Sequence, residues 1–241
     1  MRRHGFSLVE LSIVLVIMGL IVGGIMAGAS VIRNTEVKTV ITEYNQYKQA
    51  VLTFRGKYAA LPGDIPDAAS YWSGAVNGDG DGLIEWAAAA NGTGEFVQFW
   101  RHLSLAGEIE GQYTGLAGSG GPRHVVPGTN APKSTITNGG WGAFFQDMSA
   151  GDADNFAINY GNVMVLGGEI ATNWNWNMVL NPEEAWNIDM KIDDGMPGAG
   201  SIIATNRTSC ANSTSVADYA ATYQLSQKNK ICSLYFVRIN E

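Results

Sequence analysis

The sequence predicts an α+β fold in which one long N-terminal α-helix packs on a mainly antiparallel β-sheet. An almost unbroken apolar run begins at Phe6, apolar residues then recur at three- and four-residue spacing as far as Tyr58, and no proline occurs before Pro62. The rest of the 241-residue chain contains most of its 30 glycines and seven tryptophans, with short alternating stretches typical of strands and loops.

The apolar run itself, residues 6–32, contains 27 residues and a single charge, Glu10. As a helix rising ~1.5 Å per residue it would be about 40 Å long, which is enough to cross a bilayer. The two arginines of the leader, residues 1–5, favour a cytoplasmic position for this end of the chain. A secretory signal has an apolar core of about 7–15 residues followed by a small residue, whereas here the small residue, Gly5, precedes the run.

The segment from Gly5 to Glu10, Gly-Phe-Ser-Leu-Val-Glu, resembles the processing site of type IV pilins and type II secretion pseudopilins. The resemblance implies that a prepilin peptidase cuts between Gly5 and Phe6. It also implies that the new terminal Phe6 is N-methylated and that Glu10 stays in the mature helix, where it acts in assembly. We therefore expect a leader peptide at residues 1–5.

The same resemblance, combined with the apolar spacing, divides the rest of the chain. Residues 6–58 form the N-terminal helix, with residues 6–32 in the membrane or filament core and residues 33–58 amphipathic. Residues 59–241 form a globular pilin-like domain. Before assembly the chain would cross the inner membrane once with this domain in the periplasm, and after assembly it would lie in a surface filament or a periplasmic pseudopilus.

The function that this implies is that of a structural subunit, a pilin or pseudopilin, in a type IV pilus-like or type II secretion filament. Its partners would be copies of itself or other pilins, the prepilin peptidase and an inner-membrane assembly platform. The alternative is a minor or tip pilin that acts as an adhesin or ligand-binding module. Its candidate contacts are the Gly/Pro/Thr/Asn-rich segment 111–142, expected to be an exposed loop, and the pair Trp174 and Trp176.

Glu10 has a physical role that agrees with the resemblance. A carboxylate inside hydrocarbon costs roughly 2.5–3.5 kcal/mol on insertion scales and rarely persists without a partner. The α-amino group of Phe6 on a neighbouring chain would be such a partner. The alternative is a tolerated glutamate whose side chain reaches the edge of the membrane.

Composition excludes several other classes of function. Without its leader the chain has 13 Lys and Arg against 22 Asp and Glu, a net charge near −9. An acidic chain is a poor binder of nucleic acid, which requires clustered positive charge, but it is compatible with binding cations. The sequence has no H-E-x-x-H, G-x-S-x-G or Walker motif, so we do not expect an enzyme.

Two cysteines, Cys210 and Cys232, are too few for a disulfide scaffold. Outside the cytoplasm we expect them to pair. The ring that they would close contains 23 residues, for which the loop-entropy relation gives roughly 3 kcal/mol of stabilisation. The alternative is two buried thiols.

A calcium-loop pattern occurs before the second predicted helix. The candidate ligands are the side chains of Asn77, Asp79, Asp81 and Glu85 and the carbonyl of Leu83. With Gly82, the first three follow the D-x-[DN]-x-[DN]-G opening of an EF-hand loop. The twelfth position is Ala88, so the loop is not a complete EF-hand, and Glu95 is a candidate to complete the shell. The alternative is a solvated turn.

Asp193 and Asp194 are weaker calcium candidates, since they equally fit a helix end followed by a turn.

Local signals predict four further elements. Residues 95–106 form a short helix that Gly107 ends. Asn181 to Glu184 form a capping box that opens another helix. Gly161-Asn162 predicts a hairpin turn between the strand around residues 156–160 and the strand at 163–166, and residues 231–239 predict a terminal strand.

Overall fold

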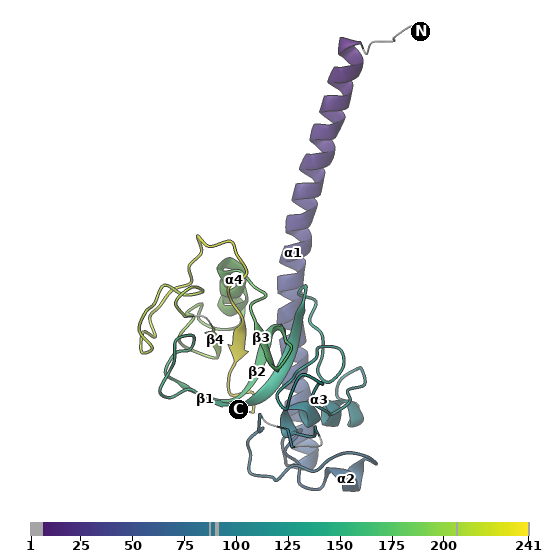
Figure 1. The fold of residues 1–241 in the computed structure, drawn as a ribbon, viewed down its shortest axis with the longest axis vertical. Coiled ribbons are helices and arrows are strands. Elements are labelled where there is room, and N and C mark those ends of the chain that lie inside the picture. Colours follow the sequence, from purple (N-terminus) through teal and green to yellow (C-terminus); the bar gives the residue numbers. More distant parts are fainter. Residues whose placement is uncertain (1–6, 87, 90–91, 206, 241) are drawn as a thin grey trace.

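A long helix and an antiparallel sheet make up the fold, which confirms the predicted α+β class (Figure 1). The computed structural model describes residues 7–86, 88–89, 92–205 and 207–240, so the predicted leader and Phe6 lie outside the described residues. The elements are α1 (Leu8–Tyr58), α2 (Ala68–Tyr71), α3 (Glu95–Leu105), β1 (Gly139–Asp147), β2 (Asn159–Ile170), β3 (Asn173–Asn177), α4 (Pro182–Ile192), β4 (Ile202–Ala204) and β5 (Leu234–Phe236).

Helix α1 has two halves with different surroundings. Its first half extends clear of every other labelled element, and its second half lies along the globular part (Figure 1). One face of the second half is buried, as the spacing predicts: the buried side chains are Val37, Val40, Tyr44, Val51 and Phe54. Tyr44 stacks on Phe236 of β5 with ring centroids 4.4 Å apart. The amphipathic half is therefore part of the hydrophobic core.

The sheet is built around β2. Its order is β1-β2-β5-β4, with β3 paired to the end of β2, and every pairing is antiparallel among the residues that the structure describes. Strand β5 is shorter than the predicted 231–239, because the chain before it pairs only through a single bridge between Leu180 and Cys232.

The predicted hairpin at Gly161-Asn162 is wrong. Strand β2 runs through both residues, and the register with β1 shifts beside them, between Gln146 and Asp147. Gly161 has φ +69°, the left-handed conformation that the sequence predicts. In the structure this conformation forms a β-bulge and not a hairpin turn. The Asn162 side chain accepts a hydrogen bond from the Ile84 N–H at 3.0 Å, which ties the bulge to a distant segment.

The prediction that residues 111–142 form an exposed loop is wrong in part. Strand β1 begins inside this range, at Gly139, and Trp141 is fully buried. Glu43 of α1 holds the segment, since its Oε2 accepts hydrogen bonds from Trp141 Nε1 at 2.8 Å and Ser134 Oγ at 2.7 Å. Three apolar side chains earlier in the segment are also buried: Val125, Ala131 and Ile136.

The two short helices form as their end signals predict. Gly107, with φ +72°, follows the end of α3. At α4 the Asn181 side chain accepts the Glu184 N–H at 2.9 Å, and the Glu184 carboxylate accepts the Asn181 N–H at 2.9 Å. Glu184 also accepts a hydrogen bond from Arg33 Nη2 of α1 at 2.7 Å, so one carboxylate caps α4 and joins it to the long helix.

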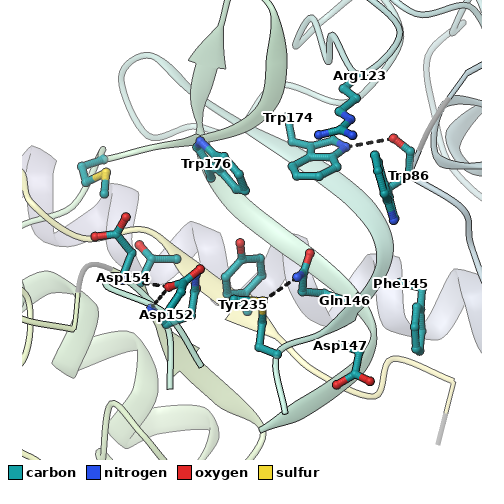
Figure 2. A pocket seen from close by; sticks show the side chains of 14 residues that line it. Trp86, Arg123, Phe145, Gln146, Asp147, Asp152, Asp154, Trp174, Trp176 and Tyr235 are labelled. Atoms are coloured by element: carbon teal, nitrogen blue, oxygen red, sulfur yellow. Dashed lines mark hydrogen bonds between the residues drawn. The ribbon is translucent and has the colours of Figure 1, made fainter. Parts of the chain in front are cut away.

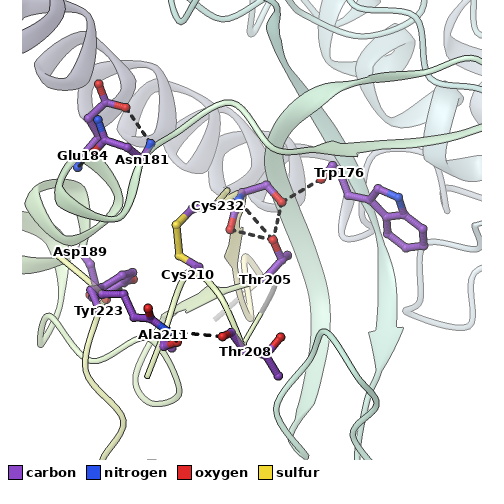
Figure 3. Close-up of a disulfide and its surroundings, with 12 residues drawn as sticks. Trp176, Asn181, Glu184, Asp189, Thr205, Thr208, Cys210, Ala211, Tyr223 and Cys232 are labelled. Carbon is purple, nitrogen blue, oxygen red and sulfur yellow. Dashed lines mark hydrogen bonds between the residues drawn. A yellow bond between two sulfur atoms is a disulfide. The ribbon is translucent and has the colours of Figure 1, made fainter. Parts of the chain in front are cut away.

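Cys210 and Cys232 form a disulfide, and both are fully buried (Figure 3). The carbonyl of Cys232 accepts the N–H groups of Val179 and Leu180 at 3.0 and 3.1 Å, immediately before β5. The bond therefore fixes the long C-terminal loop, residues 211–231, to the edge of the core.

Candidate functional site

The first half of α1 is an apolar surface that no other described part of the chain covers. Its large apolar side chains between Leu8 and Ile25 are from 47% exposed, at Val14, to 87% exposed, at Leu8. Apolar residues lie on all sides of the helix, whereas a helix that packs on a soluble core has one apolar stripe. Within the described residues, α1 is the one helix long and apolar enough to cross a membrane.

Glu10 takes part in a capping box at the start of this helix. The Ser7 N–H donates to Glu10 Oε2 at 2.7 Å, and Ser7 Oγ accepts the Glu10 N–H at 3.2 Å. Sequence reasoning missed this contact, although the spacing S-x-x-E is the known signal for it. Glu10 therefore has a local role in starting the helix, besides the intermolecular role that the resemblance implies. Gly5 and Phe6, the two predicted processing residues, lie outside the described residues.

The loop before α3 brings three of the predicted calcium ligands together. Carboxylate oxygens of Asp79, Asp81 and Glu85 lie within 4.8 Å of one another. Asp79 Oδ1 also accepts the Asp81 N–H at 3.1 Å, and Asp81 Oδ1 accepts the Leu83 N–H at 2.8 Å. These two hydrogen bonds are typical of Asx turns. The geometry of the loop is therefore compatible both with the predicted ion site and with the alternative of a turn.

Two further carboxylates complete this cluster. Asp64, which sequence reasoning missed, is buried and accepts the Gly80 N–H at 2.7 Å and the Gly82 N–H at 3.0 Å. Glu95 accepts the Asp79 N–H at 3.1 Å. Burial, followed by the contact with Glu85, raises the pKa of Glu95 to about 9. We call Asp64, Asp79, Asp81, Glu85 and Glu95 the acidic loop cluster.

Asn77 is placed differently from the other predicted ligands. Its Oδ1 accepts the N–H of Ala69 at 2.9 Å, at the start of α2.

Among the described residues, no Lys, Arg or His side chain forms an ion pair with the acidic loop cluster. Carboxylate oxygens are the hard ligands that calcium prefers, so the donor set fits this ion.

The second predicted cluster lies at the end of α4. Oxygens of Asp193, Asp194 and the buried Asp189 lie within 4.8 Å of one another. Asp193 accepts the N–H of Ser201, and Asp189 accepts the hydroxyl of Tyr223 at 2.8 Å. Burial raises the pKa of Asp189 to about 7. Carboxylate oxygens of this cluster therefore already accept hydrogen bonds within the chain.

The tryptophan pair predicted as a surface contact lines a cavity of about 460 Å³ (Figure 2). Trp174 is only 6% exposed, and its Nε1 donates to the Trp86 carbonyl at 3.1 Å. Trp176 is partly exposed and lies edge-on to Trp174, with ring centroids 5.0 Å apart. The two residues are therefore part of a concave site and not of an exposed loop.

An α+β domain carried on an apolar helix that the rest of the described residues leave uncovered defines a class: proteins whose N-terminal helix is long and apolar enough to cross a membrane. Residues 1–26 match the family model described as the prokaryotic N-terminal methylation motif, the signal motif of type IV pilins and pseudopilins. No curated protein and no solved structure matches the chain. The motif supports a pilin-like or pseudopilin substrate of prepilin peptidase, anchored in the inner membrane before assembly.

Proposed function

We propose that the chain is a structural subunit, a pilin or pseudopilin, of a type IV pilus-like or type II secretion filament. The observation that carries the proposal is the uncovered apolar half of α1, from Leu8 to Ile25, joined to the methylation motif. Lipid covers this surface in the precursor, and the α1 helices of neighbouring subunits cover it in the filament. Burying each large apolar side chain contributes about 1.5–3 kcal/mol, which drives the subunits to stay together.

The globular domain faces outward in this arrangement, in the periplasm before assembly and on the filament surface afterwards. An inner-membrane assembly platform, driven by a cytoplasmic ATPase, extracts the helix from the bilayer.

The second candidate, a minor or tip pilin, is favoured by the cavity at Trp176. Mass spectrometry of sheared filaments separates the two: a dominant signal from this chain supports the structural subunit, and a trace signal supports the tip role.

Leader removal is the first expected outcome. Co-expression with a prepilin peptidase yields a chain that begins at Phe6 and carries one added methyl group, because the peptidase recognises the basic leader and the small residue at the cut. Intact-mass measurement of the purified protein checks this, with a Gly5→Val variant as the uncleaved control. A chain that retains Met1, or that is cut after Ala27 or Ala29, contradicts the pilin assignment.

We also propose that the acidic loop cluster binds calcium. The support is two groups of carboxyl groups that share Asp79, one with Asp81 and Glu85 and one with Asp64 and Glu95, without a positively charged side chain paired to them among the described residues. Repulsion among the ionised carboxylates weakens the loop until a cation binds. Binding adds stability as RT ln(1 + [Ca]/Kd), about 2.7 kcal/mol at a hundredfold excess over Kd.

The test is thermal unfolding of the full chain in detergent, first with calcium and then with a chelator. The expected rise of the midpoint with calcium is roughly 5–10 °C for a domain of this size. The rise disappears in Asp79→Asn/Asp81→Asn and remains in Asp193→Asn/Asp194→Asn, the matched control at the second cluster. Equal midpoints with calcium and chelator mean that the loop is an ordinary turn, and loss of the rise in the control variant moves the site to the end of α4.

A further inference from the structure

The cavity at Trp176 is lined by residues from segments far apart in the chain (Figure 2). Trp86 comes from the loop before α3, and Arg123 from the segment before β1. Trp174 and Trp176 come from β3, and Tyr235 from β5. None of the lining residues belongs to α1. The cavity is therefore separate from the assembly surface, and what it binds does not depend on the filament role.

Aromatic rings form its apolar walls. Trp86 and Trp174 meet edge to face with ring centroids 5.3 Å apart, and Trp174 and Trp176 meet in the same way at 5.0 Å. Phe144 stacks behind Trp174 at 5.0 Å and holds its ring in place. Pockets with apolar aromatic walls and a few fixed polar groups are the usual form of a small-molecule site.

A hydroxyl group that faces the cavity is unpaired among the described residues. Tyr235 is 2% exposed, yet its hydroxyl is hydrogen-bonded to no residue in the part of the chain that the structure describes. Figure 2 shows this hydroxyl pointing into the space between the tryptophans. A hydroxyl that faces the cavity can both donate and accept, so its position favours a ligand that can pair with it.

The polar groups at the rim are also available. The Asp154 carboxylate and the Arg123 guanidinium form no hydrogen bond or ion pair with any described residue, although both line the cavity. A purely apolar ligand would cover these groups without pairing them. The site therefore provides an acceptor, a donor and a hydroxyl that does both.

The carboxylates around the cavity disfavour anions, and Arg123 occupies the aromatic faces where a ligand cation would bind. Arg123 already lies over the Trp86 ring, 3.8 Å from its centroid, and 5.1 Å from that of Trp174. It fills the position where a ligand cation would contact these two faces and repels a second cation. Three carboxylates line the same cavity and repel anions: Asp147, Asp152 and Asp154.

We propose that this cavity binds a saccharide, a neutral ring with one apolar C–H face and several hydroxyl groups. The C–H face packs on Trp176, the partly exposed ring of the three tryptophans. The ligand hydroxyls donate to Asp154, accept from Arg123 and pair with the hydroxyl of Tyr235. A small saccharide matches the apolar walls and the unpaired hydroxyl, and it brings no negative charge near the three carboxylates.

The experiment uses the full-length chain in a polyoxyethylene detergent, since detergents with sugar head groups would compete for the cavity. The probes are the methyl glycosides of glucose, galactose, mannose and N-acetylglucosamine, titrated while tryptophan fluorescence is recorded. At least one glycoside gives a saturable change with a Kd on the order of 1 mM. No saturable change with any of the four overturns the proposal.

Variants locate the binding. Trp176→Ala weakens it about tenfold, the value of one aromatic contact. Tyr235→Phe keeps the ring in the core and removes only the hydroxyl, and it weakens binding about fivefold. Tyr71→Phe, which removes an exposed hydroxyl on α2, leaves Kd unchanged. Unchanged affinity in both cavity variants overturns the proposal, and so does saturable binding of tetramethylammonium with the same dependence on Trp176.

Discussion

A Glu10→Gln variant enters the membrane and loses its leader normally but forms few or no filaments. In low dielectric the carboxylate attracts the terminal ammonium of a neighbouring Phe6 by about 4 kcal/mol at 4 Å, for an effective dielectric constant of 20. Glutamine keeps the shape and the hydrogen bond but loses this attraction. If about 3 kcal/mol per subunit contact is lost, the assembly constant falls on the order of 100-fold.

The capping box with Ser7 provides the control for this prediction. Glutamine at position 10 still accepts the Ser7 N–H, so the variant separates charge from helix start. Ser7→Ala removes the cap from the Glu10 backbone N–H and keeps the charge, and we expect it to assemble. Glu10→Ala removes both and fails as Glu10→Gln does. The measurement is filament yield after shearing, normalised to cleaved subunit in the membrane. A normal yield from Glu10→Gln shows that Glu10 acts only as a cap or is merely tolerated.

Reduction of the disulfide between Cys210 and Cys232 lowers the free energy of unfolding by about 3 kcal/mol. The bond closes a loop with a sequence separation of 22, and opening it increases the conformational freedom of the unfolded chain. Both cysteines are fully buried, so the folded protein resists reductant until it unfolds. The loop 211–231 has few regular elements to hold it in place of the bond.

Urea unfolding of the full chain in detergent measures this effect. Comparison of the oxidised protein with the same protein reduced in urea and refolded in reductant isolates the cross-link, because the side chains are otherwise identical. Cys210→Ala/Cys232→Ala provides a second reference and adds the cost of two small cavities. Equal midpoints for oxidised and reduced protein, with free thiols verified by mass, contradict the prediction.

The N-terminal half of α1 and the ends of the short helices were predictable because their causes are local. Residues 6–32 contain one charge, Glu10, and no proline over a length that suits a helix in an apolar environment. The Asn181 capping box and the glycine after α3 act within one helical turn. These signals act between residues close in sequence, and here no distant contact overrode them.

The predicted hairpin at Gly161-Asn162 is wrong because contacts with residues distant in sequence outweigh the local preference for a turn. The pairing of β2 with β1 extends across both residues, and the Asn162 amide bonds backbone groups of Ile84 and Gly82 in a distant loop. The positive φ of Gly161 therefore forms a β-bulge within the continuous strand. A sequence shows that a glycine permits this conformation, but the pairing of strands decides its use.

The apolar N-terminal half of α1, its single carboxylate Glu10 and the processing motif are determined by the sequence alone. The place of Asp64 in the acidic loop cluster and the cavity are determined only by the tertiary structure. Asp64 joins Asp79 because the backbone N–H groups of Gly80 and Gly82 fold back onto its carboxylate. Tyr235 meets Trp176 because antiparallel pairing and core burial bring β5 and β3 to one site. Such sites form from side chains that are distant in sequence. They come together because the whole core packs, and no local interaction in the sequence determines that packing.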